Sequence, residues 1–158
     1  MPPRADPDPP NPDLPEELTV WTSYLLRQAT IRAQQHVAKS LEGLRLRPPH
    51  NTVLQLVRQQ PQTQVALSQR TNTDRTTMVG IIDELEGLGL VTRQRDPTDR
   101  RAHRVTLTSN GEKTVDAAHA LVSAADAQIL EPLSAAERLT LRALLQKIIR
   151  HVEAKEHP

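Results

Sequence analysis

The chain has 158 residues, a formal net charge of +1 and no cysteine. This length suffices for one domain with a sizeable core, and the lack of cysteine excludes disulfides, thiolate metal sites and thiol-based redox sensing. Since no apolar run is long enough for a membrane span or a signal peptide, we expect a cytoplasmic protein.

The first residues differ in composition from the remainder of the chain. Residues 1–17 hold one base and five acids, a balance of −4, so the remaining residues carry +5. Residues 1–15 are rich in proline and poor in apolar side chains, and such a segment cannot offset the entropy cost of ordering. We therefore predict a disordered acidic tail over residues 1–15, followed by a more basic globular part.

Apolar residues recur at spacings of three or four over residues 18–44, which predicts one long amphipathic helix. A second helix is expected to open on Pro48 and Pro49, because proline is tolerated in a first helical turn, and to end at "QQPQT". Thr63 is a possible N-cap for a short third helix through Arg70.

A tight turn, "TNTD", then leads to a fourth helix that Asp74 can cap and that Gly87 and Gly89 stop. Two short helices joined in this way indicate a helix-turn-helix. The β-branched, alternating segments "LVTRQR" and "HRVTLT" follow, separated by "DPTD", and predict a two-stranded hairpin.

Two further helices complete the predicted order. Thr108 can cap a fifth helix that runs to about Leu130, and Ser134 and Glu137 have the spacing of a capping box at the start of a sixth. The sixth helix carries a continuous apolar stripe that one short domain cannot fully cover, so we expect dimerisation. This stripe consists of Leu141, Leu144, Leu145, Ile148, Ile149 and Val152.

The hairpin tip is strongly charged. The segment "RQRDPTDRRAHRV", residues 93–105, holds five arginines and two aspartates. Such a cluster forms a local basic patch suited to a polyanion such as DNA, although charge clusters are more often simply solvated turns.

The element order and the motifs together resemble one known family. Within residues 67–115, "DELEGLGLV", "RDPTDRRAHRVTLT" and "GEK" are similar to the recognition-helix end, wing and next-helix start of MarR-family transcriptional regulators, and the overall pattern covers residues 18–152. The resemblance implies a mainly α (α+β) fold: a winged helix-turn-helix domain with a two-stranded β-hairpin wing. It also implies long N- and C-terminal helices that form a dimerisation domain. We expect the helical dimerisation region to span residues 16–47 and 109–158, and the DNA-binding domain to span residues 48–108.

The resemblance further implies a homodimeric repressor that binds double-stranded DNA at a pseudo-palindromic operator, in association with the nucleoid. Residues on the exposed side of the fourth helix would read base edges in the major groove, namely Asp74, Arg75, Thr76, Thr77 and Gly80. Wing residues would contact the DNA backbone and the minor groove, namely Arg93, Arg95, Asp99, Arg100 and Arg101.

Some of these residues have alternative interpretations. Arg101 would enter the minor groove and Asp99 would shape the wing tip, but Asp99 also suits an ordinary turn. Arg93 and Arg95 alternate on a strand, where arginines point to solvent as often as they bind phosphate. Gly80 departs from the polar or basic residue of many relatives.

Small aromatic acids or phenols are the ligands that the resemblance implies, bound between the dimer helices and the DNA-binding domain. The candidate contacts are Trp21, Tyr24 and His50, although Trp21 also suits an interface anchor and His50 an ordinary helix start. Asp116 and His119 share a helix face, but without a third ligand nearby we expect no metal and no cofactor.

An enzyme is the second class of function. The sequence has no phosphate-binding glycine loop, paired carboxylates or nucleophile–histidine set at a recognisable spacing, so we expect no catalysis. A third class is a winged-helix dimeric interaction module that has lost specific DNA binding.

Overall fold

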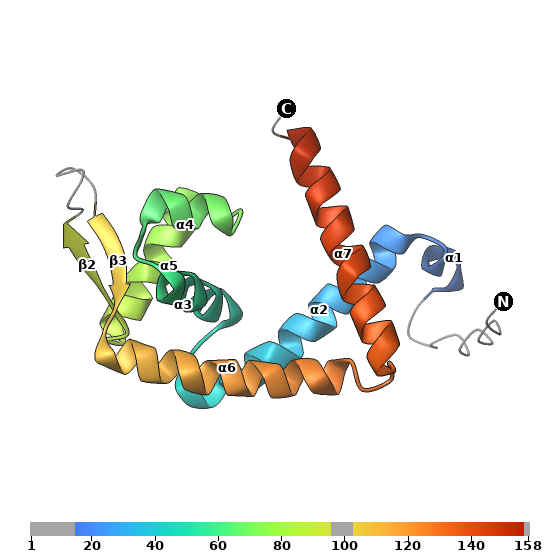
Figure 1. The fold of residues 1–158 in the computed structure, drawn as a ribbon, viewed down its shortest axis with the longest axis horizontal. Coiled ribbons are helices and arrows are strands. Elements are labelled where there is room, and N and C mark those ends of the chain that lie inside the picture. Colours follow the sequence, from blue (N-terminus) through green and yellow to red (C-terminus); the bar gives the residue numbers. More distant parts are fainter. Residues whose placement is uncertain (1–14, 96–102, 157–158) are drawn as a thin grey trace.

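The computed structural model of the chain describes residues 15–95 and 103–156. The described residues form a mainly helical structure with one small antiparallel sheet, as expected (Figure 1). In chain order, the helices are α1 (Glu16–Thr19), α2 (Thr22–Leu41), the 3-10 helix η1 (Glu42–Leu44), α3 (Pro48–Gln59), α4 (Gln64–Arg70), α5 (Arg75–Gly87), α6 (Ser109–Ile129) and α7 (Ala135–Glu156). The strands are β1 (Gln62–Thr63), β2 (Val91–Arg95) and β3 (His103–Leu107). Apart from Pro15, the tail predicted for residues 1–15 lies outside the described residues.

The prediction of one uninterrupted N-terminal helix is wrong at its start. Trp21 has extended backbone angles and precedes α2, which separates the short α1 from α2. Val20, Trp21 and Thr22 are consecutive β-branched or aromatic residues, whose side chains lose rotamer freedom against the preceding helical turn. The apolar residues keep their helical spacing through this stretch, so the spacing alone does not reveal the break in the helix.

Three other predicted helix starts are confirmed by their capping hydrogen bonds, and α3 begins at Pro48 as predicted. The Thr63 hydroxyl accepts from the backbone N–H of Ala66 at 3.2 Å, and the Thr108 hydroxyl accepts from that of Gly111 at 3.0 Å. At the start of α7, the backbone N–H of Ser134 donates to the Glu137 carboxylate at 2.8 Å. These bonds satisfy backbone donors that have no partner within the helix.

The sheet has three strands where the sequence predicts two. Strand β3 lies in the centre, with β2 on one side and the two-residue β1 on the other, both antiparallel to it. The hairpin register pairs Val91 with Leu107 and Arg95 with His103. β1 is too short to show an alternating pattern, and it forms because the loop after α3 passes along the free edge of β3.

One hydrophobic core joins the winged region to the long helices. Its members come from the end of α2, from α3, α4 and α5, from both long strands and from the first half of α6. Helix α6 runs from the hairpin along α2 to the opposite end of the molecule, where α7 departs at a steep angle (Figure 1). The winged region is therefore packed as one unit, while α7 stands apart from it (Figure 1).

Candidate nucleic-acid interface

Helix α5 has a buried side and an open side. Its buried apolar residues are Met78, Ile81, Ile82 and Leu85. Arg75, Thr76 and Val79 are exposed on the other side, and Gly80 is partly exposed beside them. A helix fixed to the core on one side and polar at its exposed N-terminal end has the form needed to enter the major groove of DNA.

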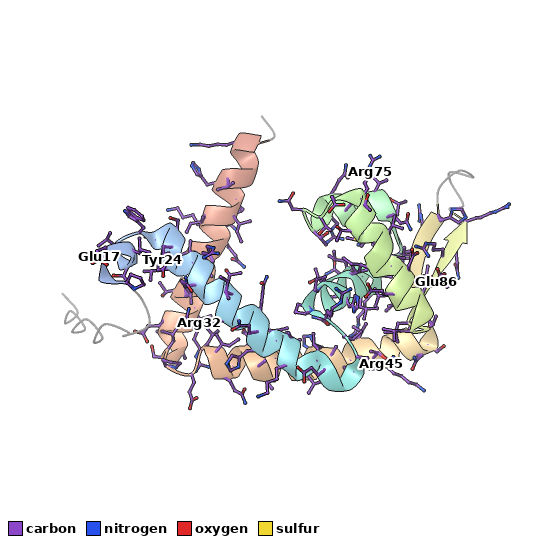
Figure 2. The ribbon with its side chains drawn as sticks, turned by 180° about the vertical axis from the view of Figure 1, so that it is seen from behind. Glu17, Tyr24, Arg32, Arg45, Arg75 and Glu86 are labelled. Carbon is purple, nitrogen blue, oxygen red and sulfur yellow. The ribbon has the colours of Figure 1, made fainter. Side chains whose placement is uncertain are left out.

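The N-terminus of α5 holds two of the predicted contacts in place. The Asp74 carboxylate accepts from the Thr77 backbone N–H at 2.9 Å and from the Thr77 hydroxyl at 2.6 Å. These bonds with Thr77 lower the pKa of Asp74, so the cap is ionised at neutral pH. Asp74 and Thr77 thus form hydrogen bonds with each other, while Arg75 extends outward from the same turn (Figure 2) and Thr76 beside it is exposed.

Arg75 occupies an unfavourable position for folding. It is the first residue of α5, and the positive end of a helix dipole disfavours a cation there. The first turn of α5 contains no acidic residue, and only Asp74, at the N-cap, offsets the charge. An external anion would offset the repulsion between the Arg75 charge and the positive end of the helix dipole. The start of α5 is therefore suited to contact a phosphate or an electron-rich base edge.

Hydrogen bonds hold the turn before α5 in place. Asn72 takes a left-handed conformation with φ 48°, and the backbone N–H of Thr73 donates to the Ser68 carbonyl at 3.0 Å. The Thr71 hydroxyl donates to the Leu67 carbonyl at 2.8 Å, which ties the turn to α4. Asparagine tolerates this backbone conformation better than most residues, so the two helices keep a tight angle.

Arg93 does not point to solvent. Its guanidinium forms ion pairs with Asp83 and Glu86 of α5, and its backbone N–H donates to Glu86 at 3.2 Å. Its side chain is only 22% exposed. Burial disfavours the charge, but the hydrogen bonds that Arg93 donates to the two carboxylates outweigh this effect and raise the pKa of Arg93. Arg93 therefore joins the wing to α5, and the structure gives no support to a direct phosphate contact by this residue.

A second ion pair neutralises the remaining acid of α5. Glu84 pairs with Arg47, which precedes α3, and accepts from His50 Nε2 at 2.9 Å. His50 Nδ1 accepts from the Arg47 backbone N–H at 3.2 Å, so Nε2 carries the proton that it donates. The hydrogen bond from Arg47 lowers the pKa of Glu84, whereas burial, with the nearby Arg47 charge, lowers that of His50. An ionised glutamate thus faces a neutral imidazole.

The remaining wing residues divide into two groups. Arg95 is exposed at the end of β2, beside His103 at the start of β3. Asp99, Arg100 and Arg101 lie outside the described residues. The roles expected for them remain predictions.

A cavity of about 630 Å³ lies between α2 and the winged region. Its lining is largely apolar, with Arg47 at its border, and comes from α2, the start of α3, the turn before α5 and α5 itself. The three predicted ligand contacts are not among its lining residues: Trp21 is 59% exposed beside α1, Tyr24 lies near it, and His50 is buried against Glu84 (Figure 2). Trp21 and Tyr24 therefore lie at the start of α2, away from the part of this helix that lines the cavity.

Two residues that shape the open side of α5 were not predicted from the sequence. Val79 is exposed on the open side of α5, and its position four residues after Arg75 was the signal that could have identified it. Arg47 acts through Glu84, which is 37 residues away in sequence, so no local pattern links them.

The arginine that joins the wing to α5 provides a test of this arrangement. Replacing Arg93 with alanine leaves Asp83 and Glu86 unpaired beside the proposed DNA surface. We expect a loss of about 1 to 3 kcal/mol in the free energy of unfolding and an approximately tenfold or larger loss of duplex DNA affinity. Urea denaturation and fluorescence anisotropy measure the two effects.

The matched control is Arg95→Ala, an exposed arginine two residues along the same strand, which should leave the unfolding free energy unchanged. Adding Asp83→Asn and Glu86→Gln to Arg93→Ala should restore part of the DNA affinity, because the unpaired charges are removed. An Arg93→Ala protein with normal stability and normal affinity would contradict the role assigned to this arginine.

Two further observations concern membrane spans and metal sites. No helix within the described ranges is long and apolar enough to cross a membrane. Residues 15–95 and 103–156 also contain no group of three or more histidine, aspartate or glutamate side chains that could hold a metal ion, and Asp116 instead pairs with Arg58 of α3 at 2.6 Å.

Comparison with known proteins agrees with the geometry. The model of the MarR family matches residues 47–103. A MarR-family transcriptional regulator from Rhodococcus sp. RHA1 is 30% identical and superposes with a TM-score of 0.79, over 85% of this chain and 96% of that one. The repressor CouR bound to a 23-mer DNA duplex is 30% identical, with a TM-score of 0.80 and the same coverage. CouR from Rhodococcus jostii RHA1 is also known bound to p-coumaroyl-CoA, a structure that is 31% identical with a TM-score of 0.76, over 85% of this chain and 95% of that one.

A Mycobacterium tuberculosis MarR-family protein in complex with salicylic acid is 27% identical, with a TM-score of 0.68 over 81% of this chain and 96% of that one. The winged helix, the exposed helix α5 and matches that span nearly the full length of these proteins lead to the same conclusion. The chain belongs to the MarR family of DNA-binding transcriptional regulators.

Proposed function

We propose that the protein is a homodimeric repressor that binds a pseudo-palindromic operator. The open side of α5 is the observation that carries this proposal. It presents Arg75 and Thr76 outward, while Arg93 and Arg47 neutralise the acids that would repel DNA. A related repressor, CouR, is known bound to duplex DNA.

Two subunits would place two α5 helices on one face of the duplex. Exposed apolar residues on α7, including Leu144 and Ile148, together with Trp21 near α1, supply the surface for the dimer. Residues 16–47 and 109–158 would then form the dimerisation region, and residues 48–108 the DNA-binding domain. Beside each α5, the wing residues Arg95, Arg100 and Arg101 would contact the backbone and the minor groove, with Asp99 shaping the tip.

Mobility shift with the DNA upstream of the protein's own gene tests the proposal. We expect retention that weakens steeply with salt, since phosphate contacts release counterions. Arg75→Ala should weaken specific binding by about 1 to 3 kcal/mol, because it removes a base-edge contact without disturbing the core. Arg32→Ala is the matched control, an exposed arginine of α2 far from α5 (Figure 2), and it should bind normally.

If the wild-type protein does not retard its upstream DNA even at low salt, the dimeric interaction module becomes the better description. Equal losses in the Arg75 and Arg32 variants would show that binding follows overall charge and does not depend on α5.

We further propose that a small aromatic or phenolic acid releases the protein from DNA by binding the cavity of about 630 Å³. The volume falls in the usual range for ligand pockets. Arg47 borders the cavity and also holds Glu84 of α5, so a ligand carboxylate would compete for this arginine. Relatives are known bound to salicylic acid and to p-coumaroyl-CoA.

Salicylate is the probe for this second proposal. It should raise the melting temperature and weaken DNA retention of the wild-type protein. Ala38→Leu, which fills the cavity, should abolish both effects, whereas Ala29→Leu on an exposed position of the same helix should preserve them. Equal responses from both variants would place the ligand elsewhere.

A further inference from the structure

The open side of α5 carries an exposed apolar side chain. Val79 is 40% exposed, whereas Met78, Ile81, Ile82 and Leu85 on the other side of the helix are all buried. Val79 lies one turn after Arg75 and one turn before Asp83, so it sits in the middle of the outward stripe. Its neighbours on that stripe are a cation and a carboxylate that is already paired with Arg93.

Gly80 leaves open space beside Val79. A Cβ atom built on Gly80 would have no neighbouring heavy atom within 4 Å, so neither packing nor close backbone approach within this chain requires glycine there. Glycine in a helix interior destabilises it by roughly 0.5 to 1 kcal/mol relative to alanine. The absent side chain therefore lowers the helix surface next to Val79 at some cost in stability, which suits the close approach of an external group.

The major groove offers one apolar group for such a contact. Among the base edges exposed there, only thymine carries a methyl group, and apolar side chains distinguish it from the polar edges of the other bases. The exposed γ-methyl groups of Val79 match this group in chemistry and in size. The adjoining residues Thr76 and Gly80 are small, so they leave room for a base edge beside Val79.

On the basis of the DNA-binding function proposed above, we propose that Val79 reads the 5-methyl group of one thymine in each operator half-site. Gly80 provides the clearance that lets the base edge reach it. Four residues of helix span about 6 Å, close to two base-pair steps of about 3.4 Å. The thymine should therefore lie one or two base pairs from the base that Arg75 contacts.

Replacement of thymine by uracil removes only the methyl group and tests this proposal directly. The operator is first selected from a pool of random duplexes with the full-length protein. Each thymine is then replaced in turn by uracil, and the Kd is measured by fluorescence anisotropy. One position per half-site should lose about fourfold in affinity, the value expected for one buried methyl group, and substitution in both half-sites should cost about fifteenfold.

The Val79→Ala protein should bind the thymine and uracil operators equally well, because it lacks the side chain that contacts the methyl group. Its melting temperature should remain close to that of the wild type. Val65→Ala is the matched control, an alanine substitution at a valine of α4 that is 45% exposed, and it should retain the full preference for thymine.

The outcomes separate this inference from the proposed function. A selected operator without any uracil-sensitive position, or a preference that persists in Val79→Ala, overturns the role of Val79 and leaves the regulator standing. If no sequence is enriched from the pool, the proposed function fails and this inference fails with it.

Discussion

Gly111→Ala should strongly destabilise the protein. A Cβ atom on Gly111 would lie 2.0 Å from the Leu90 carbonyl oxygen and 3.0 Å from its carbon, and both are backbone atoms. The same carbonyl accepts from the Thr108 backbone N–H at 3.0 Å, which fixes the start of α6 against the segment between α5 and β2. We expect a loss of about 3 kcal/mol or more in the free energy of unfolding, equivalent to a fall of roughly 6 to 12 °C in melting temperature.

Gly80→Ala is the control for this prediction, because the added methyl group meets nothing within 4 Å. It should raise stability by about 0.5 to 1 kcal/mol through helix propensity. Both variants should be compared by thermal and urea denaturation at one protein concentration, because dimer formation contributes to stability. If Gly111→Ala melts within 2 °C of the wild type, α6 does not rest on the Leu90 backbone.

Replacing Leu144 and Ile148 together with glutamate should convert the proposed dimer into a monomer. Both residues are about half exposed on the apolar stripe of α7, which stands apart from the winged region (Figure 1). Burying two carboxylates in a dimer interface is strongly unfavourable. Light scattering should then give a mass near 17.7 kDa, that of a single chain. Operator affinity should fall by a factor of about 100 or more, because the two half-sites are no longer bound by one molecule.

Gln146→Glu is the control: it places one added carboxylate on the polar side of α7 and should leave the dimer intact. Circular dichroism of the double variant checks that the helices persist. A double variant that keeps the wild-type mass and operator affinity would show that α7 is not the interface.

Local sequence patterns were sufficient to predict most helix boundaries and to identify the family. Thr63, Asp74 and Thr108 cap the helices that follow them, and Ser134 with Glu137 forms the predicted capping box. A cap depends on residues within three positions of each other, so it can be read without knowledge of the fold. The apolar stripe of α5 follows from helical spacing for the same reason.

The break at Trp21 and the strand β1 were not predicted, because each involves only a few residues. A break of one extended residue does not disturb an apolar spacing that continues on both sides of it. A two-residue strand is defined by its hydrogen bonds with β3, and not by its own composition.

The roles of the charged residues needed tertiary structure. Arg93 and Arg95 are equivalent in the sequence, two positions apart on one strand, yet Arg93 is held by two carboxylates of α5 and Arg95 is exposed. Arg47 meets Glu84 only because α3 and α5 pack side by side. The sequence by itself determined which helices form, where most of them begin and which family they build, since those features depend on neighbours along the chain. Only the tertiary structure decided which arginines form ion pairs within the chain and which remain exposed, because an ion pair depends on a distance in space that residue spacing does not specify.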